Sequence, residues 1–184
     1  MKKNNSWWEA LRFGIVLLAI IIPFRMFVAQ PFIVHGASMD ETFHQNDYLV
    51  VDELSYLWRD PRRGEVIVFK NPADPSQYFI KRVIGLPGET VRIRDGEVFI
   101  SRSDQTFKLE EDYLGSLYPR NTQLTLKEGE YFVMGDNRSV SWDSRSWGAL
   151  NRELIKGRAM FRLFPLKQDF YLPGQADYQN QTPE

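Results

Sequence analysis

The longest apolar run in the sequence covers residues 13–34, FGIVLLAIIIPFRMFVAQPFIV, and holds a single charged side chain, Arg25. A helix needs about 20 apolar residues to cross the hydrocarbon core of a bilayer, so this run is long enough to span one. A cleaved signal peptide or a buried core helix would also explain an apolar run. A cleavage site needs small residues at alternate positions, and the run ends instead in FVAQP. We therefore expect residues 13–34 to be a transmembrane anchor.

The charges before the run predict how the anchor is oriented. Residues 1–12 carry Lys2, Lys3 and Arg12 against Glu9 alone. Positively charged flanks stay on the cytoplasmic side, so residues 1–12 are expected in the cytoplasm and the rest of the chain outside it. The sequence thus predicts a single-pass protein of the plasma (inner) membrane, with the lipid bilayer as a partner.

Composition excludes several classes of function. The chain has 184 residues, 43% of them hydrophobic, which favours one compact domain. Its net charge is −1 and the charges are interspersed, so no basic surface is expected to bind nucleic acid. There is no cysteine, which excludes disulfides, a thiolate nucleophile and cysteine-ligated zinc. No cofactor and no metal is expected.

Beyond the anchor the sequence predicts antiparallel β structure. Short runs of β-branched and aromatic residues alternate with Gly, Pro, Asp and Asn, as is typical of strands and turns. The runs are DYLVVDEL, EVIVFK, QYFIKRVIG, TVRIRDGEVFI, EYFVMG and AMFRLF. Asp95-Gly96 between two alternating segments predicts a hairpin with a two-residue turn. The fold class is therefore mostly β, with a folded domain over residues 35–166.

Two polar segments are expected to lie outside the core. Residues 102–121 interrupt the strand pattern and read as a surface insertion between core strands. Residues 167–184 form a C-terminal tail, which is expected to be disordered from about Gly174 because it has few apolar residues.

Ser38 is the candidate nucleophile, and it requires a base to take its proton. His35 and His44 are the two histidines of the chain and both lie close in sequence. A buried lysine with a lowered pKa is the other base available to a serine. Lys81 lies in the apolar run YFIKRVIG, on one strand face with Phe79 and Val83. Lys81 is the best candidate for the base.

A third segment, GDNRSVSWDSRSWG at residues 135–148, concentrates polar side chains after a predicted strand. A solvated loop would have a similar composition. However, Ser141, Asp143 and Arg145 alternate and could project together, which would supply a hydroxyl for a lysine and an acid–arginine pair to fix the loop.

Together GASM, KRVIGLPGE and GDNRSVSWDSR, in this order after an apolar anchor, resemble the bacterial type I signal peptidases, membrane-anchored serine–lysine proteases of peptidase family S26. The resemblance reaches from the anchor to about Leu166 and implies a largely antiparallel β fold with an extended substrate cleft. It also implies Ser38 as nucleophile and Lys81 as general base. Ser141 is expected to orient the Lys81 amine. The remaining motif positions are expected to support the site: Asp143, Arg145, Asp136, Arg138 and Arg82.

The sequence departs from the family pattern at two positions. Glu41 stands where the family usually has proline, so we expect its carboxylate to raise the pKa of Lys81 and Glu41→Pro to stiffen the turn. Gly36 stands where some members have a serine that helps to hold the oxyanion. The oxyanion hole is then expected to rely on backbone N–H groups such as that of Ser38.

The resemblance implies an endopeptidase that removes signal peptides from exported preproteins at the outer membrane surface. Its substrates would have small residues at the first and third positions before the cut. Two alternatives remain open at this point. One is a weakly active or inactive membrane-tethered relative that binds exported chains. The other is a serine–lysine peptidase that cleaves itself.

Overall fold

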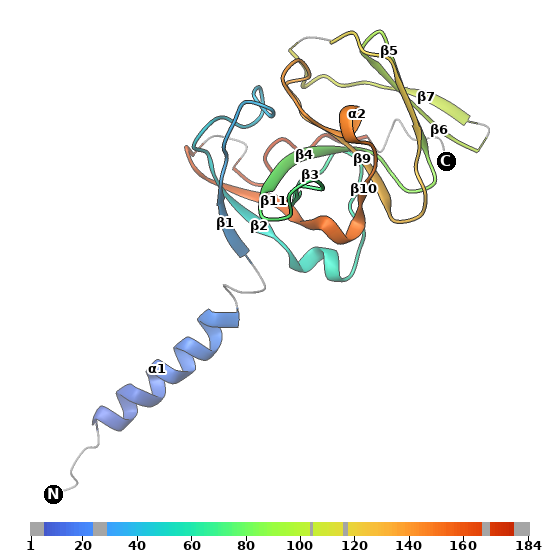
Figure 1. The fold of residues 1–184 in the computed structure, drawn as a ribbon. Helices are drawn as coiled ribbons and strands as arrows, with labels where there is room; N and C mark the ends of the chain where they lie inside the picture. Colours follow the sequence, from blue (N-terminus) through green and yellow to red (C-terminus); the bar gives the residue numbers. More distant parts are fainter. Residues whose placement is uncertain (1–5, 24–28, 104, 116–117, 167–169, 179–184) are drawn as a thin grey trace, which may run out of the picture.

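The strands form two antiparallel sheets in the computed structural model of the protein, which describes residues 6–23, 29–103, 105–115, 118–166 and 170–178 (Figure 1). The larger sheet has the order β1 (Ala29–Ile33), β2 (Tyr48–Asp52), β11 (Ile155–Phe164), β3 (Val66–Lys70), β4 (Tyr78–Gly85), β9 (Glu130–Met134) and β10 (Leu150–Asn151). The smaller sheet has the order β7 (Gln105–Leu109), β6 (Glu97–Arg102), β5 (Thr90–Arg94) and β8 (Thr122–Thr125). The short helical elements are α2 (Ser144–Trp147), η2 (Leu54–Leu57) and η3 (Arg152–Leu154).

The mostly β fold class is confirmed, and each of the predicted runs contains a strand. Strands β5 and β6 pair from Thr90↔Ser101 to Arg94↔Glu97, so the predicted hairpin is confirmed as well. Its turn residues Asp95 and Gly96 have φ of 52° and 90°. Positive φ at both positions is what a tight two-residue turn between twisted strands requires, which explains the Asp-Gly pair.

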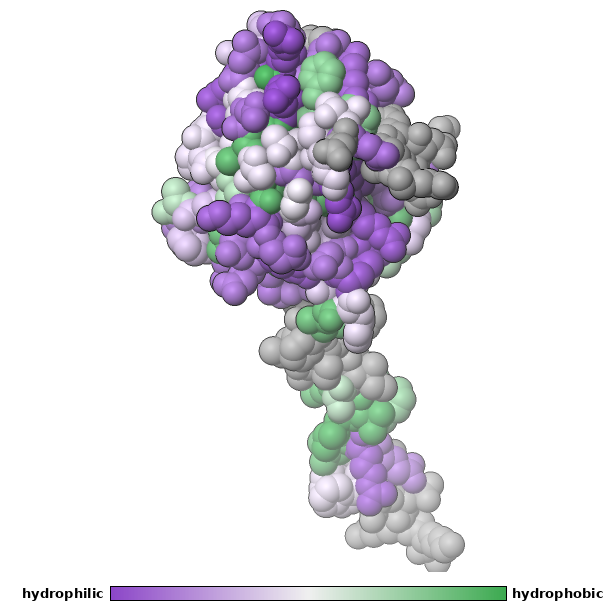
Figure 2. All heavy atoms as spheres, turned by 90° about the vertical axis from the view of Figure 1, so that its right-hand side faces the viewer, coloured by the Kyte–Doolittle hydropathy of each residue, from purple (hydrophilic) through white to green (hydrophobic). Residues whose placement is uncertain are grey.

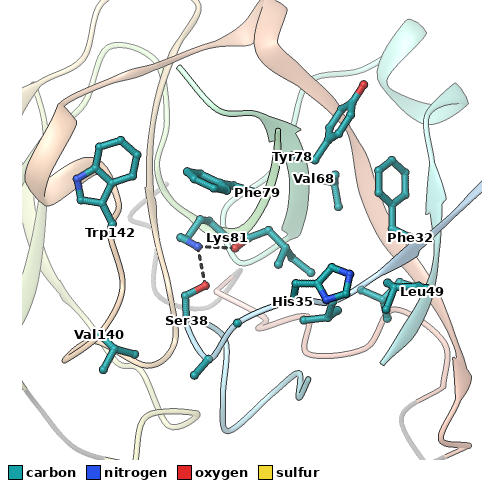
Figure 3. Close-up of a pocket in the computed structure, with 15 residues that line it drawn as sticks. Phe32, His35, Ser38, Leu49, Val68, Tyr78, Phe79, Lys81, Val140 and Trp142 are labelled. Atoms are coloured by element: carbon teal, nitrogen blue, oxygen red, sulfur yellow. Dashed lines mark hydrogen bonds between the residues drawn. The ribbon is translucent and has the colours of Figure 1, made fainter. Parts of the chain in front are cut away.

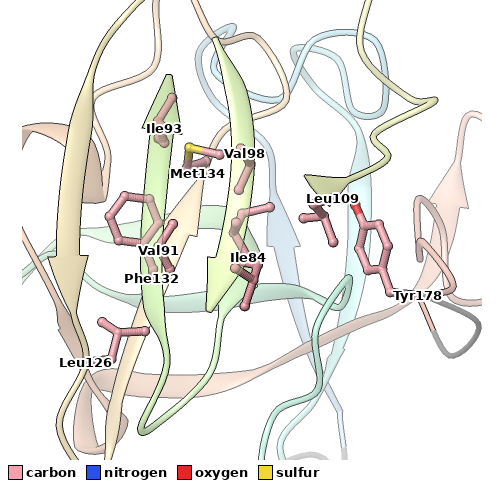
Figure 4. Close-up of a cluster of buried hydrophobic side chains, with 10 residues drawn as sticks. Ile84, Val91, Ile93, Val98, Leu109, Leu126, Phe132, Met134 and Tyr178 are labelled. Atoms are coloured by element: carbon pink, nitrogen blue, oxygen red, sulfur yellow. The ribbon is translucent and has the colours of Figure 1, made fainter. Parts of the chain in front are cut away.

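The smaller sheet packs its apolar face against β4 and β9 of the larger sheet. The side chains of this core are Ile84, Val91, Ile93, Val98, Ile100, Leu109, Leu126, Phe132, Met134 and Tyr178 (Figure 4). A second cluster on the larger sheet includes Ile67, Phe69 and Val83. Both faces of β4 are therefore buried. Lys81 and Arg82 lie in this strand and are buried with it.

The apolar run of residues 13–34 is divided between two elements. Helix α1 covers Ser6–Pro23, and residues Ala29–Ile33 form β1, which pairs with β2 at the edge of the larger sheet. The prediction of one span over 13–34 is thus corrected at its C-terminal end. Pro31 is accommodated because an edge strand has one side without a ladder. Arg25 lies outside the described residues.

Helix α1 extends away from the sheets (Figure 1). In Figure 2 its surface is hydrophobic in the part nearer the domain and has a hydrophilic patch toward the N-terminus, while the visible face of the folded domain is mostly hydrophilic. Phe13 is 69% exposed and Ile15 58%. Across the described residues, however, the structure contains no helix whose length and hydropathy are both sufficient to cross a membrane.

Residues 102–121, expected to be a surface insertion, are largely exposed in their described part, but Gln105–Leu109 form β7 at the edge of the smaller sheet. Leu109 is buried, and the side chain of Glu111 is only 5% exposed in an ion pair with Arg138. The segment is therefore part of the packed domain. The polar composition of the segment did not indicate this burial, because the carboxylate of Glu111 is paired with Arg138 of a distant loop.

The prediction that the tail is disordered from Gly174 is also wrong for its described part. Tyr178 is 5% exposed and belongs to the core between the sheets. The backbone N–H of Ala176 donates to Gly64, and the Tyr178 hydroxyl donates to Tyr113. One aromatic ring, together with backbone hydrogen bonds, anchors a segment that is polar elsewhere.

Candidate active site

Ser38 and Lys81 meet although they are far apart in the sequence. Ser38 lies in the turn that follows β1, and Lys81 lies in the middle of β4. The Lys81 amine donates to the Ser38 hydroxyl at 2.7 Å and to the Ile80 carbonyl at 2.9 Å (Figure 3). A nucleophile and its base need to be within about 2.6–3.2 Å, so this pair has the required geometry.

Lys81 is buried, with 3% of its surface exposed. Burial lowers the pKa of Lys81 to about 8, because desolvation penalises the charged amine. The charges of Asp143 and Asp136 act in the opposite direction and that of Arg145 in the same one. A pKa near 8 leaves a useful fraction of the amine neutral near physiological pH, which is the form that can accept a proton.

The Ser38 turn is anchored by apolar side chains on one side and by buried charge on the other. Met39 and Phe43 are fully buried. The Thr42 hydroxyl donates to Asp136 at 2.5 Å, and the Thr42 carbonyl accepts from Arg162 at 2.5 Å. The turn therefore has little freedom to move relative to the sheet, which keeps Ser38 in place.

Arg82, the residue after Lys81, also connects β4 to the Ser38 turn. It is fully buried and forms a two-point pair with Asp136 at 2.9 and 2.6 Å. It also donates to the carbonyl oxygens of Gly64 and Gly174, and the Tyr113 ring packs 3.9 Å from its guanidinium carbon. The predicted residues Arg82 and Asp136 thus hold β4, the turn that carries Ser38 and the C-terminal segment together.

The loop after β9 is held by Asp143 and Arg145, as the sequence predicted for a supporting pair. The Asp143 carboxylate accepts from both Nε and Nη2 of Arg145 at 2.8 Å and from the Gly135 N–H at 3.0 Å. Burial raises the pKa of Asp143, but the hydrogen bonds and charge of Arg145 outweigh burial and leave that pKa below its usual value. Arg145 also donates to the Arg138 carbonyl.

Gly135 sets how closely this loop approaches Ser38. A Cβ at this position would overlap both the Ser38 carbonyl and the Ser141 side chain. The Ser38 carbonyl in turn accepts a hydrogen bond from the Asn137 N–H at 3.1 Å. The glycine of GDN is therefore required by contact with the serine turn.

Ser141 lies in the site but does not make the predicted contact. Its side chain is close to Gly135, and no hydrogen bond joins it to Lys81 in the described part of the chain. The second acceptor of the Lys81 amine is a backbone carbonyl instead. Arg138, the remaining motif residue, lies behind the loop, where it pairs with Glu111 and donates to the Gly135 carbonyl.

Among the described residues, no hydrogen bond joins either histidine to Ser38. His35 is exposed, and its Nδ1 lies 3.1 Å from the Gln45 amide nitrogen. His44 is also exposed, and its backbone N–H donates to Asp47. The choice of Lys81 over the histidines as the base is thus consistent with the geometry.

The backbone donors near Ser38 are not equivalent. The Gly36 N–H donates to the Gln45 Oε1 at 2.7 Å, so it is already engaged. Among the described residues, no acceptor is bonded to the Ser38 N–H. The Ser38 N–H is therefore the better candidate for an oxyanion donor, and Gly36 is not one in this conformation.

Ser38 and Lys81 open into a cavity of about 380 Å³. Its wall is mainly aromatic and aliphatic: Phe32, Leu49, Val68, Tyr78, Phe79 and Trp142 (Figure 3). The described residues include no group of three or more His, Asp or Glu side chains arranged to hold a metal ion. A serine that is hydrogen-bonded to a buried lysine and lies in an apolar cleft suits a peptide substrate.

The geometry also explains which residues the sequence did not reveal. Thr42, Arg162, Glu111, Tyr113 and Gly174 all take part in the buried network around Arg82, Asp136 and Arg138. Glu111, Tyr113 and Gly174 lie in segments whose composition indicated a surface location. Arg162 alternates with apolar residues in β11, and that pattern could have marked it as buried.

The family model described as signal peptidase, peptidase S26 matches residues 7–164. The chain belongs to this family. It is 35% identical to a probable signal peptidase I-2 of Synechocystis, covering 95% of this chain and 81% of that protein. It is 40% identical to a signal peptidase I of Leptolyngbya laminosa, covering 91% and 84%. A crystal structure of a signal peptidase I from Enterococcus faecalis V583 aligns with 55% of this chain and 98% of its own at 35% identity, with a TM-score of 0.48. Family membership makes the chain a serine endopeptidase of the signal peptidase I type.

Proposed function

We propose that this chain removes N-terminal signal peptides from exported preproteins with Ser38 as nucleophile and Lys81 as general base. The observation that carries the proposal is the 2.7 Å hydrogen bond between Lys81 and Ser38, made by a buried amine whose pKa is lowered to about 8. The pair is intact and opens into an apolar cleft. This arrangement argues against an inactive relative, because a buried lysine destabilises the fold and an inactive site would gain nothing in return.

The reaction proceeds by acyl transfer. Neutral Lys81 accepts the Ser38 proton as the Ser38 oxygen bonds to the scissile carbonyl carbon, and the negative oxygen that forms is stabilised by the Ser38 N–H. Breakage of the peptide bond releases the mature protein, whose new amino group takes the proton from Lys81. Lys81 then accepts a proton from the water that attacks the acyl carbon and returns it to the Ser38 oxygen as the ester bond breaks, which frees the signal peptide and restores the Ser38 hydroxyl and the neutral amine.

The remaining motif residues act through position. Arg82 and Asp136 fix β4 relative to the serine turn, and Asp143 with Arg145 fixes the adjoining loop. Preproteins with small residues at the first and third positions before the cut are the proposed substrates. An extended chain presents every second side chain to the protein, which suits such a preference.

We also propose that the N-terminal region anchors the enzyme in the plasma membrane, with residues 1–12 cytoplasmic and the sheets outside. The exposed apolar side chains of α1 support this, since they are costly in water. A tag at residue 1 should be protected from protease in intact spheroplasts, while the chain around residue 120 should be cleaved. Cleavage of the tag alone would reverse the proposed orientation.

The experiment that tests the activity is cleavage of a purified preprotein, with the N-terminus of the product sequenced. The proposal predicts one cut after a small residue, and none with Ser38→Ala. A self-cleaving peptidase would instead fragment its own chain during incubation without preprotein. A binding protein would retain the preprotein uncut.

A further inference from the structure

The reaction proposed above leaves His35 without a role, although its side chain lines the cleft. The ring lies among the cavity residues, on the side of Phe32 and Leu49 (Figure 3). His44, in the same connection between β1 and β2, does not line the cavity. The two histidines therefore differ in what they can reach, and a bound peptide would pass His35.

Gln45 fixes the orientation of the His35 ring. The Gly36 N–H is a donor, so the Gln45 atom that it contacts at 2.7 Å must be the amide oxygen. The Gln45 nitrogen then has two hydrogens to donate. One points to His35 Nδ1 at 3.1 Å and the other to the Asn46 Oδ1 at 3.3 Å.

The identity of these atoms determines the tautomer. Because the Gln45 nitrogen can only donate, His35 Nδ1 must accept and carries no proton. The proton of the neutral ring is therefore on Nε2. Gln45, which holds Nδ1, does not line the cavity, and among the described residues no hydrogen bond is made by Nε2, so the Nε2–H is the ring group available to a bound peptide.

The surroundings make such a donor selective. Apart from Ser38 and Lys81, the neighbouring cavity residues are mainly aliphatic or aromatic. A purely apolar wall favours an alkyl side chain over a hydroxyl, since a hydroxyl loses its water on entry. An N–H at the wall offsets that loss for a group that can accept a hydrogen bond.

We propose that His35, held by Gln45, is a specificity-determining residue that donates its Nε2–H to a hydroxyl oxygen of a substrate side chain. The cleft would then bind a preprotein with serine better than one with alanine at the position that faces His35. The proposal rests on the function proposed above for its substrate class. It concerns binding and not the chemical step, so the two can be tested separately.

The test measures the binding of peptides that span a cleavage site to the full chain carrying Ser38→Ala, so that no peptide is cut. Alanine and serine are compared at each of the four residues before the cut. A neutral hydrogen bond is worth about 0.5–1.5 kcal/mol, so at one position the serine peptide should bind about two- to tenfold more tightly. His35→Phe, which keeps a ring without the N–H, should abolish that ratio.

Two variants serve as controls. His35→Gln places an amide N–H near the Nε2 position and should retain part of the ratio. His44→Phe should leave the ratio unchanged, because His44 is also exposed but does not line the cavity. The proposal fails if no position shows a serine preference, or if His35→Phe preserves it. Cleavage by the unmodified chain is measured alongside, and its absence would count against the proposed function and not against this binding role.

Discussion

Lys81 of β4 donates to Ser38 of the β1–β2 connection at 2.7 Å, and the amine reaches it from within the sheet, where it is 3% exposed. This relationship places a group that prefers water in an apolar environment. Burial of the Lys81 amine lowers the stability of the fold, and the charges of the nearby carboxylates offset only part of that loss.

Lys81→Met should therefore stabilise the protein near pH 7 while removing its activity. The pKa of Lys81 falls from 10.5 in the unfolded chain to about 8 in the fold, so the unfolded state binds more protons between these values. The loss of stability caused by burying Lys81 is complete below about pH 8 and disappears as the pH rises toward 10.5. The gain from Lys81→Met should reach about 3 kcal/mol at pH 7.

The measurement is urea unfolding of the two proteins at pH 7 and pH 10. Other alkaline titrations affect both proteins equally, so the difference between them isolates Lys81. A difference that is the same at both pH values would contradict the account.

Asp143→Asn should destabilise the fold by about 3 kcal/mol, because it leaves the buried Arg145 guanidinium without its carboxylate. Asp60→Asn is the matched control. Asp60 pairs with Arg152 at 3.2 Å, but its side chain is 79% exposed, and an exposed pair contributes little. Thermal unfolding of both variants compares them, and equal losses of stability would show that burial is not what makes the Asp143 pair important.

Gly174→Ala should lower both stability and kcat. Gly174 has φ of 69°, and a Cβ there would overlap the Thr42 methyl group and approach Arg82. The substitution would therefore displace the turn that carries Ser38 and strand β4. Gly129→Ala provides the control, since Gly129 has φ of 73° and no atom near its Cβ position. The positive φ should destabilise both variants by a similar amount, about 1 kcal/mol. Any larger loss of stability in Gly174→Ala is then due to the overlap of its Cβ with Thr42. An equal kcat for the two variants would contradict it.

Glu41 is not among the charges that shift the pKa of Lys81, contrary to the expectation from the sequence. Its φ is 93°, which proline cannot adopt, so Glu41→Pro should disrupt the turn and lower activity. Glu41→Gly should be neutral or stabilising by about 1 kcal/mol, because glycine tolerates positive φ. The charges that shift the pKa of Lys81 are Asp143, Asp136 and Arg145, so Glu41→Gln should leave the pH profile unmoved. Activity and unfolding of the three variants test this, and a more active Glu41→Pro would show that the turn can change its conformation.

The sequence predicted those parts of the fold that depend on local patterns. Alternating apolar residues identified the main strands, and Asp95-Gly96 identified a turn with positive φ at both positions. The sequence could not predict that Glu111 and Tyr178 are buried, because their neighbours are polar and their partners come from other segments. It also assigned residues 29–33 to the apolar anchor, since an apolar edge strand and the end of an apolar helix look alike in a single sequence.

For the candidate site, the motifs supplied the residues but not all of their contacts. Ser38 and Lys81 are hydrogen-bonded, and Asp143 and Arg145 form the expected pair. Ser141 was expected to orient the lysine, yet the Ile80 carbonyl accepts from the amine instead. Backbone carbonyls carry no sequence signal, so a contact of this kind appears only in the structure.

The dependence of kcat/KM on pH for a purified preprotein tests most directly whether neutral Lys81 activates Ser38. We expect activity to rise with pH through a midpoint near 8, where burial places the pKa of Lys81. Ser38→Ala and Lys81→Ala should each abolish cleavage, and the double variant should be little worse than either, because the two residues act as one unit. Substantial cleavage by Lys81→Ala, or an acid limb that disappears in His35→Ala, would contradict the assignment of Lys81 as the base.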